Sequence, residues 1–283
     1  MMQLGYSTWG MPTLPADVAI PYLAKLGFEA VELTVIPGWV TELSTLDAPA
    51  RRAIRQLYDD YQIDLPALAG HVPILTPEDE YRQNLARLQA EVDLAVDLAG
   101  ADGPPPLNTA TGGDPERWET DKELAVERIG ELTRYGESRG VVIALEPHVG
   151  QGLNSPEKTL WLLDQIDSPW LRVNFDISHF NVQGMSIEET VPPMAPVSVH
   201  THVKDERGVL PDYEFLIPGE GEMDYTRYLK AMDAAGYTGS ITVEISKQVQ
   251  ARPDYDPFAA ARQSYAVLDA AWQEAGLPRL RDG

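Results

Sequence analysis

Four side chains able to bind a metal stand near the ends of four apolar stretches of the chain. They are three carboxylates and one imidazole: Glu146, Asp176, His202 and Glu244. Carboxylate oxygen and imidazole nitrogen, without thiolate, suit a divalent cation such as Mn²⁺, Mg²⁺, Co²⁺ or Zn²⁺. A buried salt-bridge network is the alternative, but burying four ionisable groups is costly and few basic partners are at hand. The four residues are predicted to hold one divalent ion, whose identity the sequence does not select.

The stretch around His202 shows how such groups come to face one site. From residue 197 to 205 apolar and polar residues alternate, and this period of two is typical of a strand. His202 therefore shares one face with His200 and Lys204. Lys204 is predicted as a catalytic group that binds a substrate oxygen or an enolate, with pairing to an acid as the alternative. His200 lies one step deeper, which favours a supporting role over ligation.

Further residues near the predicted strand ends are candidates for contact with a substrate. His148 shares a strand face with Glu146 and is predicted to carry a proton; a neutral core imidazole is the alternative. His179, His71 and Trp9 are predicted to bind substrate, the indole by stacking on a sugar face. A helix-side histidine, a capping histidine and a core tryptophan are the respective alternatives.

The elements that must position these residues alternate along the whole chain. Strands are predicted at residues 3–8, 30–35, 63–72, 102–109, 141–148, 171–176, 197–205 and 241–245. Helices are predicted at residues 13–26, 47–61, 76–100, 115–139, from 155, from 186, at 224–236 and at 257–275, with a long loop leading up to residue 221.

Eight strands with intervening helices predict an α/β fold, because parallel strands need crossover helices. At 283 residues and without a linker, the chain is expected to form one (β/α)8 TIM barrel over residues 1–283. The active sites of such barrels lie at the C-terminal ends of the strands, where all four predicted ligands fall. A doubly wound open sheet is the alternative, although no Gly-x-Gly-x-x-Gly turn follows the first strand.

Composition narrows the range of partners. Lys and Arg number 22 against 44 Asp and Glu, and the formal charge of −22 argues against nucleic acid or an anionic membrane. No apolar run approaches the roughly 20 residues of a membrane helix. The absence of cysteine excludes disulfides and thiolate ligands, and no signal peptide is evident at the start. A cytoplasmic location is expected, and a homo-oligomeric assembly is compatible with these features.

In these motifs the sequence resembles the sugar phosphate isomerase/epimerase superfamily, the xylose isomerase-like TIM barrels. The resemblance covers nearly the whole chain and is sharpest at Glu146, at residues 176–179, 202–205 and 218–221, and at Glu244. Ketose 3-epimerases, 2-keto-inositol isomerases and inosose dehydratases belong to this group. The resemblance implies that Glu146, Asp176, His202 and Glu244 hold one metal ion and that His179 contacts the substrate.

Two comparisons within that superfamily restrict the reaction. Ketose 3-epimerases carry a second glutamate six residues after the first ligand, where this chain has Gly152, and His148 is the residue placed to fill part of the gap. The more distant endonuclease IV needs further metal ligands: no histidine lies between His71 and Glu146, and no Asp-x-His follows His202. Nuclease activity is therefore disfavoured.

The expected reaction is proton transfer next to a carbonyl. A divalent ion would stabilise an enediolate, with Glu146 and Glu244 as base and acid on opposite faces of a keto-sugar or keto-polyol. That predicts an isomerase or epimerase. If the enolate expels a neighbouring hydroxyl, the same site is a dehydratase or lyase of a keto-inositol or related keto-sugar. A metal-binding subunit without catalysis is the remaining alternative.

Overall fold

Eight parallel strands close into a barrel in the computed structural model, which describes residues 1–279. Around the barrel each strand pairs with its neighbours in the order β1-β10-β7-β6-β5-β4-β3-β2. Residues 280–283, which the single-domain prediction included, lie outside the described residues. The barrel strands are β1 (Gln3–Ser7), β2 (Ala30–Thr34), β3 (Leu68–Ala69), β4 (Leu107–Ala110), β5 (Ile143–Glu146), β6 (Leu171–Asp176), β7 (Ser198–Val203) and β10 (Ser240–Val243).

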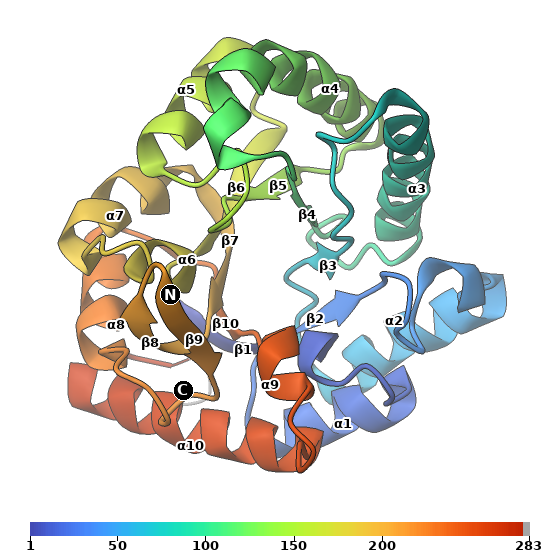
Figure 1. Cartoon of the computed structure of the whole chain (residues 1–283). Helices are drawn as coiled ribbons and strands as arrows, with labels where there is room; N and C mark the ends of the chain where they lie inside the picture. The colour runs from blue at the N-terminus through green and yellow to red at the C-terminus, as the bar shows by residue number, and fades with distance from the viewer. Residues whose placement is uncertain (280–283) are drawn as a thin grey trace.

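A ring of helices surrounds the strands, one long helix after each of them (Figure 1). This arrangement confirms the predicted (β/α)8 barrel. The long helices are α1 (Ala16–Leu26), α2 (Ala48–Tyr61), α3 (Glu78–Asp97), α4 (Trp118–Arg139), α5 (Pro156–Ile166), α7 (Ile187–Met194), α8 (Tyr225–Ala234) and α10 (Pro257–Ala275). The short ones are α6 (Ser178–Asn181) and α9 (Lys247–Gln250). Within residues 1–279, no helix has both the length and the apolar character to cross a membrane.

Side-chain caps fix where several helices begin, as the sequence predicts. Asp47, Ser155 and Asp224 each accept a hydrogen bond from a backbone N–H in the first turn of α2, α5 and α8. Ser186 and Glu189 form a capping box at the start of α7. These caps set the length of the connections that leave each strand and so help to position the strand ends.

Several predicted boundaries are wrong. Strand three is only Leu68–Ala69, because Pro66 lacks the N–H that a longer ladder would need. The Pro-rich segment before Leu107 likewise delays strand four. Helices α1 and α3 begin at Ala16 and Glu78, a few residues later than predicted, after the N-cap prolines Pro15 and Pro77.

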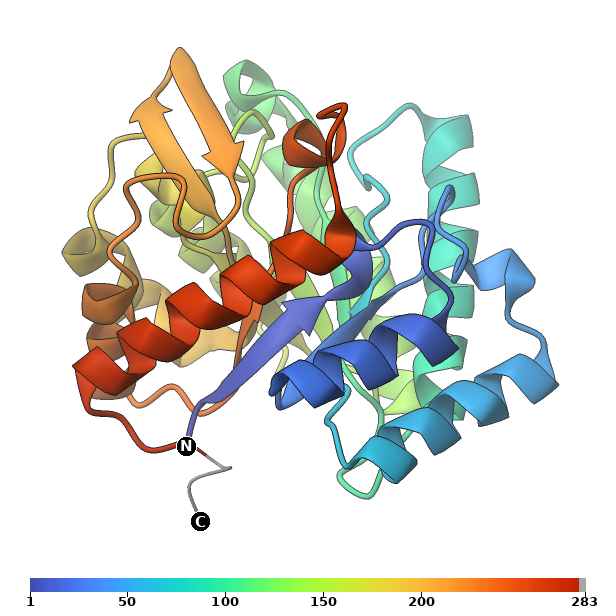
Figure 2. The same cartoon turned by 90° about the horizontal axis from the view of Figure 1, so that it is seen from below.

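The long loop predicted before residue 221 is largely a β-hairpin. Its strands β8 (Asp205–Val209) and β9 (Asp212–Leu216) pair with each other and not with the barrel. Gly208 has φ +77°, and a Cβ there would meet Asp212 O at 2.4 Å, so the turn requires glycine. The hairpin stands above the C-terminal end of the barrel, and α9 lies at the same end (Figure 2). It therefore covers one side of the predicted active-site face.

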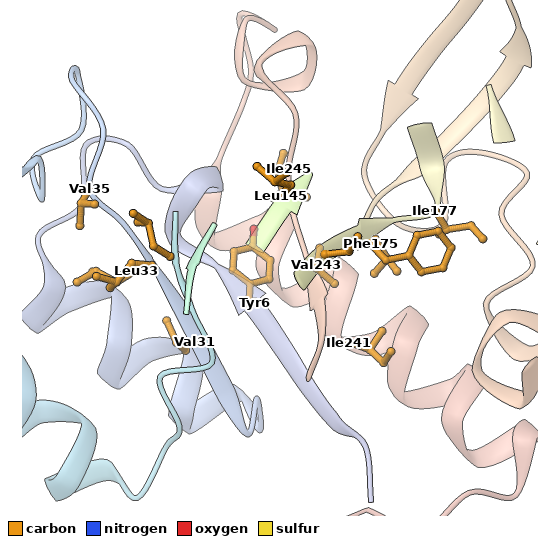
Figure 3. Packing of buried hydrophobic residues seen from close by; sticks show 14 of the residues in the cluster. Tyr6, Val31, Leu33, Val35, Leu145, Phe175, Ile177, Ile241, Val243 and Ile245 are labelled. Carbon is orange, nitrogen blue, oxygen red and sulfur yellow. The ribbon is translucent and has the colours of Figure 1, made fainter. Parts of the chain in front are cut away.

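The barrel strands separate an apolar outer layer from a polar interior. Tyr6, Leu33 and Val243 belong to the continuous buried cluster that includes the surrounding helices (Figure 3). Polar residues alternate with such side chains along the strands and are fully buried within the barrel: Glu32, Asn108, Asn174, His200 and His202. Branched apolar side chains usually fill a TIM barrel. The interior of this barrel instead contains groups that must hydrogen-bond to one another.

The anchor of the hairpin gives a test of the fold. The Asp205 carboxylate accepts hydrogen bonds from the backbone N–H groups of Glu206, Gly219, Gly221 and Met223, at 2.7–3.0 Å. An amide offers one acceptor oxygen in place of two, so Asp205→Asn leaves buried donors unpaired. We expect the free energy of unfolding in urea to fall by about 1–3 kcal/mol.

The matched control is Asp212→Asn, at an exposed position on β9 of the same hairpin. It should shift the unfolding midpoint by little. Equal midpoints for the two variants would contradict the anchoring role of Asp205.

Candidate metal centre and substrate cavity

The four predicted ligands converge at the C-terminal end of the barrel. One donor atom from each of Glu146, Asp176, His202 and Glu244 lies within 4.8 Å of the others, and all four residues are buried. Two donor atoms about 2.0–2.2 Å from a shared ion are at most about 4.4 Å apart. The set therefore needs only a small closure to surround one divalent cation. Three carboxylates and one imidazole also match the oxygen and nitrogen ligands that such ions take.

Hydrogen bonds fix which nitrogen of His202 faces this centre. Asn174 Nδ2 lies 3.1 Å from Glu146 Oε2 and 3.1 Å from His202 Nδ1. An ionised carboxylate can only accept, so the amide nitrogen is the end of Asn174 that faces Glu146 and His202. His202 Nε2 lies 2.9 Å from Glu32 Oε2 and is the donor of that bond. Nδ1 is therefore the nitrogen on the side of the centre, 3.6 Å from Glu146 Oε2 and 3.7 Å from Glu244 Oε1. Burial lowers the pKa of His202, but Glu32, Glu244 and Glu146 outweigh it and raise the pKa well above its usual value, so a metal ion has to displace a proton from Nδ1.

Glu32 is a residue of the site that the sequence analysis missed. It is fully buried on β2, and its other oxygen, Oε1, lies 3.2 Å from His200 Nε2. Burial raises the pKa of the Glu32 carboxyl, but His202 and His200 outweigh this and hold the pKa well below its usual value. Carboxylates that accept from the second nitrogen of a ligating histidine set its tautomer and orientation. In the sequence, Glu32 stands out only as an acid in the middle of a largely apolar strand.

Lys204 lies among the ligands and pairs with two of them. Its Nζ is 2.6 Å from Asp176 Oδ2 and also contacts Glu244 Oε2. Burial lowers the pKa of this lysine, but the charges of Asp176 and Glu244 outweigh burial and raise it above the usual value. Lys204 is therefore a fixed cation and a hydrogen-bond donor. The structure shows the alternative considered for Lys204, pairing with an acid; binding of a substrate oxygen or an enolate stays a prediction.

The histidines predicted to bind substrate or carry a proton surround Glu146. His71 Nε2 lies 2.5 Å from Glu146 Oε2, and His179 Nε2 lies 3.4 Å from Oε1. The rings of His148 and His179 lie against each other with centroids 3.7 Å apart and planes tilted by 38°. Burial, with His179 nearby, lowers the pKa of His148 to about 3, and its Nδ1 lies 2.6 Å from the Val149 carbonyl. His148 is therefore neutral and suits accepting a hydrogen bond better than storing a proton.

A cavity of about 380 Å³ opens over the centre. Its walls include seven of the nine predicted site residues: Trp9, His71, Glu146, His148, His179, Lys204 and Glu244. Asp176 and His202 do not line it and lie fully buried. Tyr213 and Phe215 of the hairpin line the cavity as well. The arrangement leaves two of the four ligands, both glutamates, in reach of a bound molecule.

Comparison with known proteins agrees with the barrel fold. Residues 20–271 match the family model described as the xylose isomerase-like TIM barrel. The chain belongs to that family.

Individual relatives are distant. A fructoselysine 3-epimerase of Shigella flexneri is 24% identical over 280 residues, covering 94% of this chain and 98% of that protein. An inosose dehydratase of Geobacillus thermodenitrificans is 22% identical over 160 residues, or 51% of this chain and 54% of that protein. An uncharacterised protein of Methanocaldococcus jannaschii is 32% identical over 121 residues, and the match spans only 41% of its length.

Solved structures share the fold. The IOLI protein with a binding zinc atom has a TM-score of 0.79 at 18% identity, over 97% of this chain and 99% of that one. A xylose isomerase-like barrel protein from Mycobacterium smegmatis in complex with magnesium has a TM-score of 0.70 at 18% identity, over 97% and 98% of the two chains.

The ligand assignment predicts how three variants differ in metal affinity. Asp176→Asn and His202→Ala remove predicted ligands, so each should weaken Mn²⁺ or Zn²⁺ binding by more than the roughly 10–100-fold typical of supporting groups. His200→Ala, which removes a neighbour of Glu32, should weaken binding less. Competition with a fluorescent chelator measures all three. Equal losses at His200 and His202 would mean that the wrong histidine is assigned.

The role of Glu32 is tested separately. Glu32→Gln keeps the size of the side chain and removes the charge that fixes the His202 tautomer, so metal affinity should fall about 10–100-fold. In the metal-free protein, the ¹⁵N chemical shifts of His202 should show a lowered pKa, because Glu32 contributes most to raising the pKa of this imidazole against burial. Glu91→Gln is the matched control, because Glu91 is a fully buried acid on α3 that pairs with Arg87 outside the barrel. An unchanged His202 pKa in Glu32→Gln would refute the assignment.

Proposed function

We propose that this protein is a divalent-metal-dependent isomerase or epimerase that acts on a keto-sugar or keto-polyol. One observation carries the proposal: four ligands converge within 4.8 Å, and only Glu146 and Glu244 among them also line the cavity. A proton-transfer pair must touch both the ion and the substrate, and this arrangement gives that property to two carboxylates. The similarity to a fructoselysine 3-epimerase supports the same reaction class.

Each glutamate contacts both the centre and groups of the cavity wall. Glu146 Oε2 lies 3.6 Å from His202 Nδ1 and 2.5 Å from His71 Nε2, and Oε1 lies 3.4 Å from His179 Nε2. Glu244 Oε1 lies 3.7 Å from His202 Nδ1, and Oε2 contacts Lys204. The two carboxylates thus have different neighbours in the wall. A substrate held between them would meet one carboxylate on each face, as the removal and return of a proton require.

The remaining groups have complementary tasks. A bound divalent ion supplies a Lewis acid that makes a proton next to a carbonyl more acidic. Glu146 and Glu244 exchange that proton. Lys204, a fixed donor beside Glu244, binds the substrate oxygen on which negative charge develops. His179, His71 and Trp9 orient the substrate against the two glutamates, and the hairpin restricts access of water from above.

A dehydratase is the second candidate. The adjacent His148 and His179 rings stand beside Glu146 in the cavity wall, where one could assist departure of a hydroxyl group from the enolate. The match to an inosose dehydratase over half the chain favours the same alternative. Both reactions begin with the same proton abstraction, so the first test does not depend on which one follows.

The first test is deuterium exchange in the metal-loaded protein. Incubated in D₂O with a panel of keto-sugars and keto-inositols, the wild type should incorporate deuterium at the carbon next to the carbonyl of its substrate. Glu146→Gln and Glu244→Gln should each lower the rate by about 10²–10⁴, because loss of a general base has that effect. Mass spectrometry measures the exchange at saturating metal. Glu127→Gln, an exposed position on α4, is the control.

Each outcome has a distinct meaning. Exchange with a rearranged sugar as product supports the isomerase or epimerase, and loss of water supports the dehydratase. Near-normal turnover by Glu244→Gln with metal bound would leave Glu244 as a ligand alone. Metal binding without exchange on any ketose would overturn the proposed catalysis and leave a metal-binding subunit.

A further inference from the structure

A second lysine lines the cavity, three residues after the predicted metal ligand Glu244. Lys247 opens α9, directly after the segment that follows β10, and it belongs to the cavity wall. Its Nζ lies 5.2 Å from the ring centre of Trp9 and 5.1 Å from that of Trp39. The two indoles pack against each other with ring centres 4.9 Å apart and planes tilted by 37°, and Trp39 Nε1 donates to the Trp9 carbonyl at 3.1 Å. The ammonium group thus rests on a rigid aromatic surface.

No acid neutralises Lys247 within residues 1–279. Its side chain forms no ion pair with a carboxylate there, whereas Lys204 in the same cavity pairs with two acids. The chain has 44 acidic residues against 22 basic ones, so an acidic partner would be easy to supply. An exposed lysine is unremarkable by itself, but this one combines a fixed position, an uncompensated charge and a place in the wall of the catalytic cavity.

A second donor stands next to it. Gln248 also lines the cavity, and its Oε1 accepts a hydrogen bond from Phe215 N at 3.0 Å. That bond identifies the oxygen end of the amide and leaves Nε2 with no protein acceptor among the described residues. One ammonium and one amide N–H₂ group are therefore adjacent on α9, and the carboxylates of the cavity wall, Glu146 and Glu244, belong to the metal centre.

We propose that the substrate carries an anionic group, a carboxylate or a phosphate, which binds to Lys247 and Gln248. The inference rests on the proposed function and adds the substrate class. The Cα atoms of Glu244 and Lys247, three residues apart, are at most about 11 Å from each other, and both side chains line the same cavity of about 380 Å³. A single ketose can therefore contact both. In the proposed reaction the carbonyl end lies at the metal centre, where Lys204 and the bound ion offset the acids, so the charged end lies at the uncompensated ammonium of α9.

The test compares matched ligands on the metal-loaded, full-length protein. The substrates are a neutral ketose, the same ketose with a terminal phosphate, and the ketose with a terminal carboxylate. Lys247→Met keeps the alkyl stem on the indoles and removes the charge. We expect the ratio of kcat/KM for an anionic ketose to that for the neutral one to fall at least about fivefold, mainly through KM. Lys247→Arg should retain most of the ratio.

Lys25→Met is the matched control. Lys25 is also exposed, lies 5.9 Å from the ring centre of Tyr61, and stands on α1 away from the cavity. Its loss changes the net charge equally and should leave the ratio as in wild type. A comparison of kcat/KM for the ketose with a phosphate and the ketose with a carboxylate shows which of the two anions the site prefers. In the wild type, KM for the preferred anion should rise with salt, and this dependence should weaken in Lys247→Met.

The outcomes separate this inference from the proposed function. Deuterium exchange on neutral ketoses with no preference for either anion would overturn the anion site and leave the isomerase intact. A Lys247→Met variant that loses neutral and anionic substrates equally would also overturn it, since the lysine would then only support Trp9. No exchange on any ketose, neutral or charged, would overturn the proposed function itself.

Discussion

Electrostatic repulsion among three buried carboxylates is the constraint on which the site depends. Glu146, Asp176 and Glu244 offer oxygens within 4.8 Å of one another. At that separation and an effective dielectric constant of about 20, each pair repels by about 3.5 kcal/mol, or on the order of 10 kcal/mol for three pairs. This is comparable to the whole free energy of unfolding of a typical domain. Lys204 offsets part of it by pairing with two of the acids. A divalent ion would offset the remainder, so the same charges that disfavour folding without compensation provide metal affinity.

The polar barrel interior follows from this constraint. His202 must present Nδ1 to the acids, so its opposite nitrogen needs an acceptor inside the barrel, and Glu32 provides it. Glu32 is itself a buried charge, and the approach of His200 and a 3.4 Å hydrogen bond from Asn108 help to compensate it. Glu32 thus pairs with the His202 imidazole above it, and His200 and Asn108 in turn approach the Glu32 carboxylate. A conventional interior of branched apolar residues would leave Nε2 of His202 unpaired and its orientation undetermined.

Features that depend on residues close together in the sequence could be predicted, and features that depend on distant residues could not. The barrel, and the convergence of the four candidate ligands at its strand ends, could be predicted because strand alternation and helix caps are local signals. The hairpin was not, since residues 205–209 include three charged side chains and a glycine and show no apolar face. Glu32 was visible as an acid within an apolar strand. Its role was not, because its partner His202 lies 170 positions away and the two meet only when the barrel closes.

Charge is unevenly distributed between the two ends of the cavity. The floor concentrates acids whose compensation comes from Lys204 and, when bound, an ion. Another part of the cavity wall, over Trp9 and Trp39, holds an uncompensated ammonium. A neutral ketose would have little reason to prefer one orientation over the other on electrostatic grounds. A ketose with one anionic end would bind in a single direction, because its charge is attracted by the ammonium at α9, whereas the charges of the floor offset one another once an ion is bound. The carbonyl would then face Glu146 and Glu244 whenever the substrate binds. Holding the reacting groups in this geometry lowers the entropic part of the activation barrier.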